Sequence, residues 1–436
     1  ATLATAVDLV AIHDVAVQHD AELQAAAFRR EAAAENIDQA WSNYLPQISV
    51  SGTLTKGQNM SEVAGFTQPD SNVNTRSYQA SLDQSLISWR NIGRIDQARA
   101  QVSQAEAEYQ TAYQSFLLRV AERYFQVLTA RDSLRFARAE EKALRRQYEQ
   151  AEQRFEVGLT AVTDVHEAKA SYDQARSRTI IASNDLDDAY QALQELTGKD
   201  FRALDELRES LELTQPEPGD AGEWVRIALA NNPDLEQARD AAEVADASIE
   251  IERASYLPSI DGFVRWQRFS NQAFPVRNDA QEVVGETSFI SADTQIGVSF
   301  NWQLFSGLGN ISRTRQARTE FRAAEADVDF QQRATVRATR NAYRAVMADI
   351  REVEARRQAL VSADSALEAT EAGFEVGTRT IVDVLLSEQR FFQAQRDHSR
   401  ARHDYILDQL RLRQAAGILE PEDLVAINKL LESPQQ

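Results

Sequence analysis

An internal repeat over nearly the whole length is the feature that most constrains this chain. Tyr44-Leu45-Pro46 recurs as Tyr256-Leu257-Pro258, 212 positions later. Farther along, Phe155-Glu156-Val157-Gly158 recurs as Phe374-Glu375-Val376-Gly377, and there the displacement is 219 positions. One insertion of seven residues in the second copy accounts for the difference between the two displacements. The chain is therefore expected to consist of two structural repeats that differ by one insertion.

Strict alternation marks a strand in the second repeat. Residues 290–304 place apolar side chains on one face and polar side chains or glycine on the other, the period of a strand with one apolar and one wet face. Weaker alternation marks three partner strands, near Ile48, Tyr78 and Ile260. The first repeat, residues 1–214, is thus expected to hold a β-hairpin at about 46–88. The second, residues 215–436, is expected to hold one at about 258–305, with the insertion at its tip.

Long helices are expected to follow each hairpin. Between Gly93 and Gly158 the chain has 64 residues without proline or glycine, and apolar residues recur at steps of three and four. This is coiled-coil spacing, and a helix over about 92–156 would be roughly 95 Å long. The second copy predicts a long helix over about 310–375. Return helices are expected over about 161–197 and 380–416.

Glycine and proline mark where these elements begin and end. Gly158 and Gly377 are expected to reverse the long helices, because glycine adopts the left-handed conformation of a helix cap. The proline of each Tyr-Leu-Pro motif is expected to end a helix and start a strand, because it pushes the preceding residue toward extended geometry. The polar stretch 215–220 joins the repeats, and with the C-terminal tail from Gly417 it is expected to pack at the equator of the molecule.

Four strands are too few for a closed membrane barrel, because the smallest known barrels have about eight. Their apolar faces would be exposed to water in a soluble chain. Strands from several subunits must therefore combine in a bilayer. The expected fold class is mainly α with a β-barrel part.

Composition excludes several classes of function. The net charge of −20 would repel a nucleic acid. The chain has no cysteine, and its five histidines form no metal-binding spacing. No carboxylate pair or nucleophile can be assigned to a catalytic site, so we expect neither an enzyme nor a cofactor. Of the basic residues only five are lysine, which indicates either a GC-rich genome or a salt-loving source.

The chain resembles the TolC family of outer-membrane export ducts, its namesake branch more closely than its lipid-anchored members. The likeness runs from about Asp8 to Pro434. It rests on both Tyr-Leu-Pro motifs, on Arg154-Phe155 and Val157-Gly158-Leu159 with Thr163-Asp164-Val165, and on the run from Gly377 to Leu385. Each motif is weak alone, but together they stand in register with a repeat of the whole chain.

The resemblance implies a homotrimer whose twelve strands form a barrel in the bacterial outer membrane. An α-helical barrel continues it across the periplasm and closes at the periplasmic end as an iris of helices. Such a duct is passive and serves multidrug efflux, type I protein secretion or both. Its partners are outer-membrane lipid, a periplasmic adaptor (membrane fusion protein) and an inner-membrane transporter of the RND, ABC or MFS class.

The resemblance also implies three groups of functional residues. The adaptor-contact tips are Val157, Gly158, Leu159, Thr160, Val376, Gly377 and Thr378. The gate network is Thr163, Asp164, Phe374 and Arg379, and the pore constriction is Asp383 with Leu386. Leu386 stands where the namesake branch has a second aspartate, and Phe374 stands where it has a tyrosine. Both departures predict a looser or more apolar closure.

Other interpretations fit parts of the sequence. Gly158 and Gly377 could be helix caps only, Asp164 and Asp383 could serve only the helix dipole, and Arg379 could be a solvated charge. The runner-up function is a structural coiled-coil scaffold without a transport role, which leaves the alternating strand at 290–304 unexplained. A third interpretation, a periplasmic binding protein or enzyme, would need a compact core that such helices do not provide.

Overall fold

The computed structural model describes residues 7–59, 62–63, 66–67, 71–277 and 283–433. It is mostly helical, with a four-stranded sheet and two short two-stranded ladders, which confirms a mainly α fold with a smaller β part. Within these ranges no helix combines the length and apolar character needed to cross a membrane.

The chain divides into two compact units. Unit 1 consists of Ala1–Arg30, Glu106–Gln237 and Val328–Gln436, and unit 2 of Glu31–Ala105 and Ala238–Asp327. Both units take residues from both halves of the chain. The compact units therefore do not follow the division of the sequence into residues 1–214 and 215–436.

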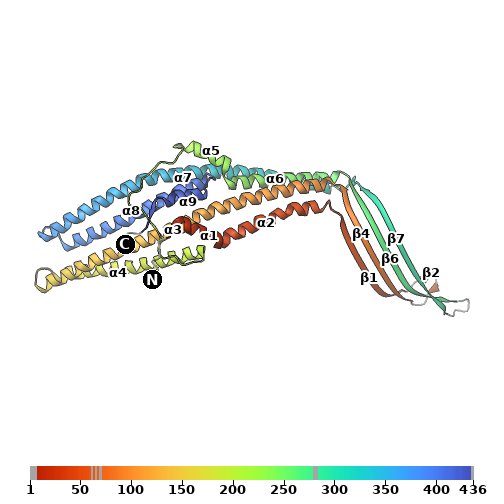
Figure 1. Cartoon of the computed structure of the whole chain (residues 1–436), viewed down its shortest axis with the longest axis horizontal. Helices are drawn as coiled ribbons and strands as arrows, with labels where there is room; N and C mark the ends of the chain where they lie inside the picture. The colour runs from red at the N-terminus through yellow and green to blue at the C-terminus, as the bar shows by residue number, and fades with distance from the viewer. Residues whose placement is uncertain (1–6, 60–61, 64–65, 68–70, 278–282, 434–436) are drawn as a thin grey trace. The chain divides into compact units, whose positions relative to one another are not determined.

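Unit 2 contains the four-stranded antiparallel sheet, in the order β1-β4-β6-β7 (Figure 1). Its strands are β1 (Gln47–Asn59), β4 (Ser71–Ile87), β6 (Ser259–Arg277) and β7 (Val283–Asn301). Two further strands, β2 (Glu62–Val63) and β3 (Phe66–Thr67), pair with each other between β1 and β4 in the sequence. The second hairpin is the longer one, as expected from the insertion, although its tip at 278–282 lies outside the described residues.

One face of this sheet is apolar. Ile48, Leu82, Val264 and Ile296 stand in register across the four strands, so their side chains share a face. Ile48 is 74% exposed and Ile296 is 80% exposed in the single chain. The sheet therefore leaves an apolar surface that the described residues of the chain do not cover.

Both Tyr-Leu-Pro motifs hand a helix over to a strand, as predicted. Helix α2 ends at Ser42, and β1 begins directly after Pro46. The short 3-10 helix η1 (Ala254–Tyr256) likewise precedes Pro258, after which β6 begins. The Tyr44 hydroxyl donates a hydrogen bond to the Ser88 carbonyl (2.8 Å), which ties this corner to the start of the next helix.

Nine α-helices lie in the described part of the chain. They are α1 (Leu9–His19), α2 (Ala21–Ser42), α3 (Trp89–Glu156), α4 (Val162–Thr197), α5 (Ala221–Asn231), α6 (Pro233–Arg253), α7 (Gly309–Glu375), α8 (Ile381–Ala415) and α9 (Pro421–Asn428). The long helices α3 and α7 have 68 and 67 residues, close to the predicted ranges 92–156 and 310–375. Their interiors lack proline, so no backbone hydrogen bond has to be given up along them.

Unit 1 has the larger core, where α1, α5 and α9 pack against the middle of α3 and the end of α8. Phe116, Tyr124 and Tyr405 are almost completely buried there. The Tyr124 hydroxyl donates to the Asp205 carbonyl (2.9 Å), and the Tyr405 hydroxyl donates to the Thr214 carbonyl (2.9 Å). These two tyrosines hold the end of the first repeat, residues 205–214, against the helices.

The C-terminal tail packs on the same segment. Strand β5 (Glu206–Leu207) pairs with β8 (Leu431–Glu432), and Leu424 and Ile427 of α9 belong to the buried core. Residues 204–213 and the C-terminal tail thus pack on the core of unit 1.

Substitution of Gly417 would test how closely the backbone packs in this core. Its φ is +74°, and a Cβ atom there would lie 2.3 Å from the Asn231 carbonyl oxygen. Gly158 has a φ of +75° with open space around it. Gly158→Ala should therefore cost only the left-handed strain, roughly 1 kcal/mol. Gly417→Ala should cost at least twice as much, because backbone must also shift. Equal shifts of the two thermal unfolding midpoints would contradict the close packing at Gly417.

Candidate functional site at the helical turns

Two turns lie at the same end of unit 1, one between α3 and α4 and one between α7 and α8 (Figure 1). Gly158 and Gly377 have φ values of +75° and +77°, the left-handed conformation that their residue type predicts. In the first turn the Leu159 N–H donates to the Arg154 carbonyl (2.8 Å), and in the second the Thr378 N–H donates to the Gly373 carbonyl (2.8 Å). Both helices thus end in the same hydrogen-bonded cap.

The second turn is tied more closely than the first. The Thr378 hydroxyl and the Arg379 N–H also donate to the Gly373 carbonyl, at 3.0 and 3.2 Å. A Cβ atom on Gly373 would lie 2.7 Å from the Arg379 Cγ, so the arginine side chain lies directly over this glycine. Gly373 was not among the residues predicted to be functional. The sequence does distinguish this position, because the first repeat has Arg154 at the equivalent place, 219 positions earlier.

The two return helices begin differently. Thr380 and Asp383 form a capping box, in which the Thr380 N–H and hydroxyl donate to the Asp383 carboxylate at 3.0 and 2.9 Å. The corresponding residue at the start of α4 is Ala161, which has no side-chain cap. The Thr160 hydroxyl instead donates to the Asp164 carboxylate.

The capping box also changes the acidity of Asp383. Hydrogen bonds from the Thr380 backbone and side chain lower the pKa of Asp383 below its usual value, because they favour the charged form. Repulsion among several copies of Asp383 brought together at a pore axis would raise this pKa. Within one chain the pKa moves in the opposite direction.

Within one chain, the other proposed gate residues are not bonded to one another. Thr163 and Arg379 are exposed, and Asp164 is half-buried with Thr160 as its partner. Among the described residues, no hydrogen bond or ion pair joins Thr163, Asp164 and Arg379 to each other. Bonds among these three side chains would have to form between subunits.

Phe374 links the two helical hairpins. Its ring lies beneath the Arg154 guanidinium, 4.9 Å from carbon to ring centroid, so an arginine of α3 covers an aromatic ring of α7. Phe374 also packs against a buried apolar cluster from α3, α4 and α8: Leu144, Ala151, Ala168, Ala175, Ile381 and Leu385. The phenyl ring thus contributes packing where a tyrosine would also offer a hydroxyl.

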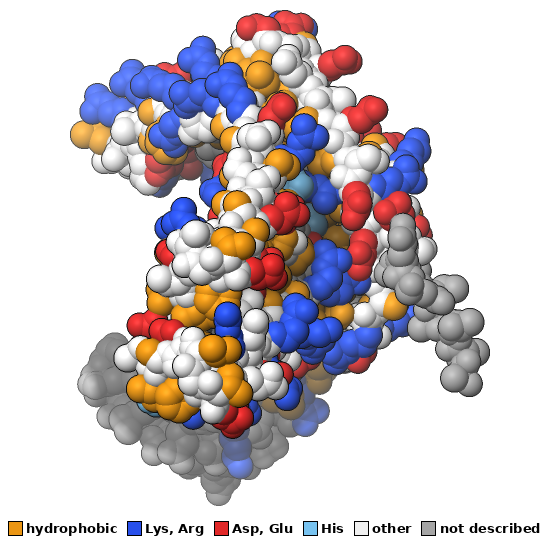
Figure 2. Space-filling view, turned by 90° about the vertical axis from the view of Figure 1, so that its left-hand side faces the viewer, with side chains coloured by type: hydrophobic (Ala, Val, Ile, Leu, Met, Phe, Trp, Pro, Cys, Tyr) orange, Lys and Arg blue, Asp and Glu red, His pale blue; other side chains and the backbone are white. Residues whose placement is uncertain are grey.

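Apolar side chains remain uncovered at both turns. Val157, Leu159 and Val376 are 69%, 72% and 75% exposed, and Leu386 is 44% exposed. Figure 2 shows this end of unit 1, with hydrophobic side chains at the surface among charged ones of both signs. Small exposed apolar groups beside hydrogen-bonded turns suit contact with another protein better than contact with water.

A buried carboxylate joins three helices behind the turns. Glu140 of α3 is 1% exposed and accepts hydrogen bonds from Arg178 of α4 (2.7 Å) and Arg396 of α8 (3.0 Å). Two arginines compensate one buried charge, so removing either partner is expected to be costly. No sequence pattern pointed to this contact.

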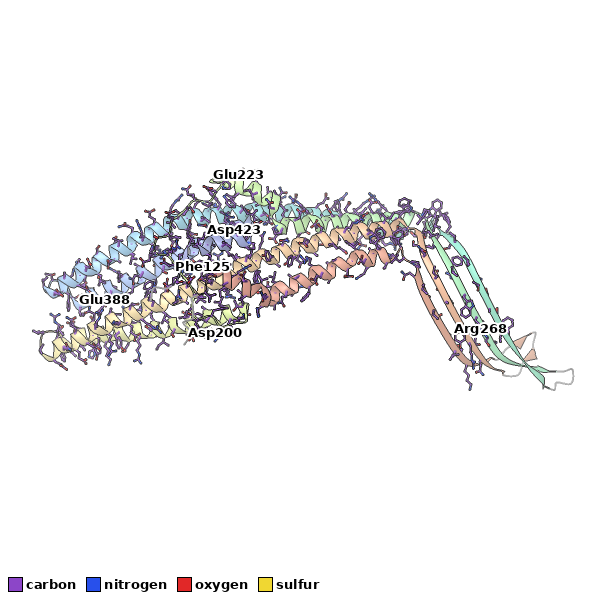
Figure 3. The ribbon with its side chains drawn as sticks, in the orientation of Figure 1. Phe125, Asp200, Glu223, Arg268, Glu388 and Asp423 are labelled. Carbon is purple, nitrogen blue, oxygen red and sulfur yellow. The ribbon has the colours of Figure 1, made fainter. Side chains whose placement is uncertain are left out.

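A second buried carboxylate lacks such compensation. Glu388 of α8 is 4% exposed, and its one hydrogen bond comes from the Gln147 side-chain amide of α3 (3.2 Å). The other carboxylate oxygen and the Gln147 side-chain oxygen have no partner among the described residues. Burial raises the pKa of Glu388 to about 7, against the lowering effect of the Gln147 hydrogen bond and of Arg146. The nearby charges of Glu371 and Glu140 also raise this pKa. Figure 3 labels Glu388 near the turn end of α8.

Glu388 should make the packing of α8 on α3 dependent on pH. The packed state holds the proton up to about pH 7, whereas a solvated glutamate releases it near 4.5. Stability should therefore fall by up to about 3 kcal/mol as pH rises through this window, and stay level above it. Glu388→Gln should remove this share of the loss of stability between pH 5 and 8.

The test is the thermal unfolding midpoint of the assembled protein between pH 5 and 8. Glu368→Gln, an exposed change on α7, is the matched control and should keep the slope of the unaltered protein. If Glu388→Gln keeps that slope as well, Glu388 is not the group that titrates.

Known proteins are similar to this chain over nearly its whole length. A family model described as outer membrane efflux protein matches residues 13–199 and 224–418. Outer membrane protein TolC of Vibrio cholerae is 37% identical, over 98% of this chain and 95% of that protein. The Escherichia coli protein of the same name is 32% identical over 99% and 87%. The alkaline protease secretion protein AprF of Pseudomonas aeruginosa is 27% identical over 97% and 86%.

Solved structures agree in fold. The outer membrane protein VceC from Vibrio cholerae matches with a TM-score of 0.74 at 20% identity, over 94% of this chain and 96% of that one. The Campylobacter jejuni CmeC outer membrane channel matches with a TM-score of 0.76 at 16% identity, over 97% and 90%.

The matched family model and the relatives named above define a channel protein of the bacterial outer membrane, and the solved structures share its fold of long helical hairpins and a four-stranded antiparallel sheet. The chain belongs to the outer membrane efflux protein family. The resemblance to the TolC family is thereby confirmed, and the chain is an exit duct in the outer membrane. This family consists of export channels and is not a family of enzymes. The alternative of a scaffold without a transport role is therefore set aside.

Proposed function

We propose that three copies of this chain form a passive duct whose twelve strands close a barrel in the outer membrane. The sheet order β1-β4-β6-β7 carries this proposal, because β1 and β7 have no outer neighbour among the described strands. Open edges and an exposed apolar face are both removed when sheets join edge to edge in lipid. The number three rests on the family resemblance. The helices of unit 1 would then continue the duct through the periplasm as an α-helical barrel.

The duct would receive its cargo from an inner-membrane transporter of the RND, ABC or MFS class through a periplasmic adaptor. The names of the relatives support efflux, and that of AprF supports protein secretion as a second use. Val157, Gly158, Leu159, Thr160, Val376, Gly377 and Thr378 would form the adaptor contact. The exposed apolar side chains at both turns support this assignment.

The gate would lie beside these turns. Thr163, Asp164 and Arg379 have no bonds to one another within the chain, so their bonds would form between neighbouring subunits, with Phe374 packed behind them. Asp383 and Leu386 would line the narrowest point on the pore axis. A leucine at the second position supports a closure that is partly apolar.

Planar bilayer recordings test the duct and its gate together. Arg379→Ser and Asp164→Ala should raise single-channel conductance severalfold, because each removes bonds of about 0 to 1 kcal/mol that recur in three subunits. Asp383→Ala should weaken block by multivalent cations added on the periplasmic side. Arg176→Ser, which removes an exposed charge of α4, is the control and should conduct like the unaltered channel. An unchanged conductance in Arg379→Ser would refute the gate.

The adaptor contact is tested by straining the turns. Gly158→Val and Gly377→Val place a β-branched residue at positive φ and should reduce chemical crosslinking to the adaptor severalfold. Gly219→Val, in a position with open space for a Cβ atom and no positive φ, should crosslink normally. If all three variants capture the adaptor equally well, the turns are not the contact.

A further inference from the structure

Charged side chains on the sheet of unit 2 are sorted by face. The face with Ile48 and Ile296 also carries Lys56, Arg76 and Arg268, and it has no carboxylate among the described strand side chains. The opposite face carries three carboxylates and one cation: Asp83, Asp261, Asp293 and Arg265. Arg265 lies 3.6 Å from Asp83, so this cation is paired.

The three cations of the apolar face form a diagonal row over adjacent strands. Lys56 of β1 pairs with Asn74, two residues before Arg76 of β4. Arg268 of β6 pairs with Tyr78, two residues after Arg76. Diagonal neighbours in a sheet lie about 7 to 8 Å apart, so the row spans roughly 15 Å.

All three side chains are exposed, and in the described ranges none of them has a carboxylate partner. Figure 3 labels Arg268 on the strands. The chain as a whole has a net charge of −20. This unpaired row of cations on the apolar face is therefore free to bind an anion from outside the chain.

The row lies at the far border of the apolar face. Ile48 stands next to the helix-to-strand corner at Pro46, and Lys56 follows eight residues later; Arg268 likewise follows Ile260 by eight residues. Eight residues in a tilted strand rise roughly 20 Å, close to the height of about 25 Å of the apolar band of a membrane barrel. The cations are thus about one hydrocarbon thickness from the helices.

We infer that Lys56, Arg76 and Arg268 bind the phosphate groups of lipopolysaccharide, the phosphorylated glycolipid of the outer leaflet. The inference rests on the proposed function, because the closed barrel turns the apolar face to lipid and places the helices in the periplasm. The far border of that face then meets the headgroups of the outer leaflet.

The chemistry of the row favours this occupant over an ordinary phospholipid. Long basic side chains can lie along apolar surface with their charged ends among headgroups. The two guanidinium groups can each hold phosphate oxygens in pairs. A row of three cations over roughly 15 Å matches a sugar headgroup with several phosphates better than a lipid with one. Tyr78, which pairs with Arg268, places an aromatic hydroxyl at the same level.

The experiment uses the detergent-purified assembly and lipid vesicles of defined composition. Chemical crosslinking before lipid is added establishes the trimer, so failure of the proposed assembly is seen separately. Binding is then measured to lipopolysaccharide, to dephosphorylated lipopolysaccharide and to phosphatidylglycerol. The unaltered trimer should bind phosphorylated lipopolysaccharide most tightly. Each lost cation should weaken that binding roughly fivefold, and the variant with Lys56→Gln, Arg76→Gln and Arg268→Gln roughly a hundredfold.

Arg265→Gln is the matched control for Arg268→Gln. The two changes lie three residues apart on β6, remove the same charge and fall on opposite faces of the sheet. Arg265→Gln should bind lipopolysaccharide as the unaltered trimer does. Equal binding by the triple variant and the unaltered trimer would overturn the site. Equal binding of phosphatidylglycerol or of dephosphorylated lipopolysaccharide by the unaltered trimer would overturn the choice of ligand.

Discussion

The antiparallel pairing of β4 with β6 is the interaction on which unit 2 depends. It joins residues that are far apart in the sequence, such as Ala80 and Trp266, and makes one sheet of two hairpins. A lone hairpin is marginally stable in water, whereas four strands with a common apolar face can form a stable surface. This pairing also brings the apolar rows of the two hairpins into register. The sorting of charges by face follows from that register.

Contacts between helices have the corresponding role behind the turns of unit 1. The Glu140 carboxylate holds an arginine from α4 and another from α8, and Phe374 holds Arg154 over its ring. Between these contacts lies Glu388, which is buried and, in the part of the chain that the structure describes, forms no ion pair. The helical hairpins α3–α4 and α7–α8 are therefore held together by favourable contacts on either side of one unfavourably buried carboxylate. A rearrangement of the hairpins would require the least energy where that carboxylate becomes solvated.

In this chain, sequence patterns predict the local structure better than they predict the contacts between helices. Helix α3 ends at Glu156 as predicted and begins three residues before the predicted position 92, because glycine and proline act on their own backbone. The positive φ of Gly158 and Gly377 follows for the same reason. The contacts of Glu140 and Glu388 were not predicted, because their partners lie on other helices. Which residues of two helices meet depends on how the whole helices pack. The bond between Thr160 and Asp164 was missed because sequence spacing does not decide which hydroxyl a carboxylate meets.

The unequal starts of the return helices have a consequence for local unfolding. Helix α8 begins with a complete capping box, whereas the N-cap residue of α4, Ala161, makes no side-chain hydrogen bond, a difference of about 1 kcal/mol. The first turn of α4 should therefore fray several times more often than that of α8. The two repeats would then differ in how often the helix after the turn unfolds locally, more often in the first repeat and less often in the second. A partner that grips both tips would reshape the first while the second held its form.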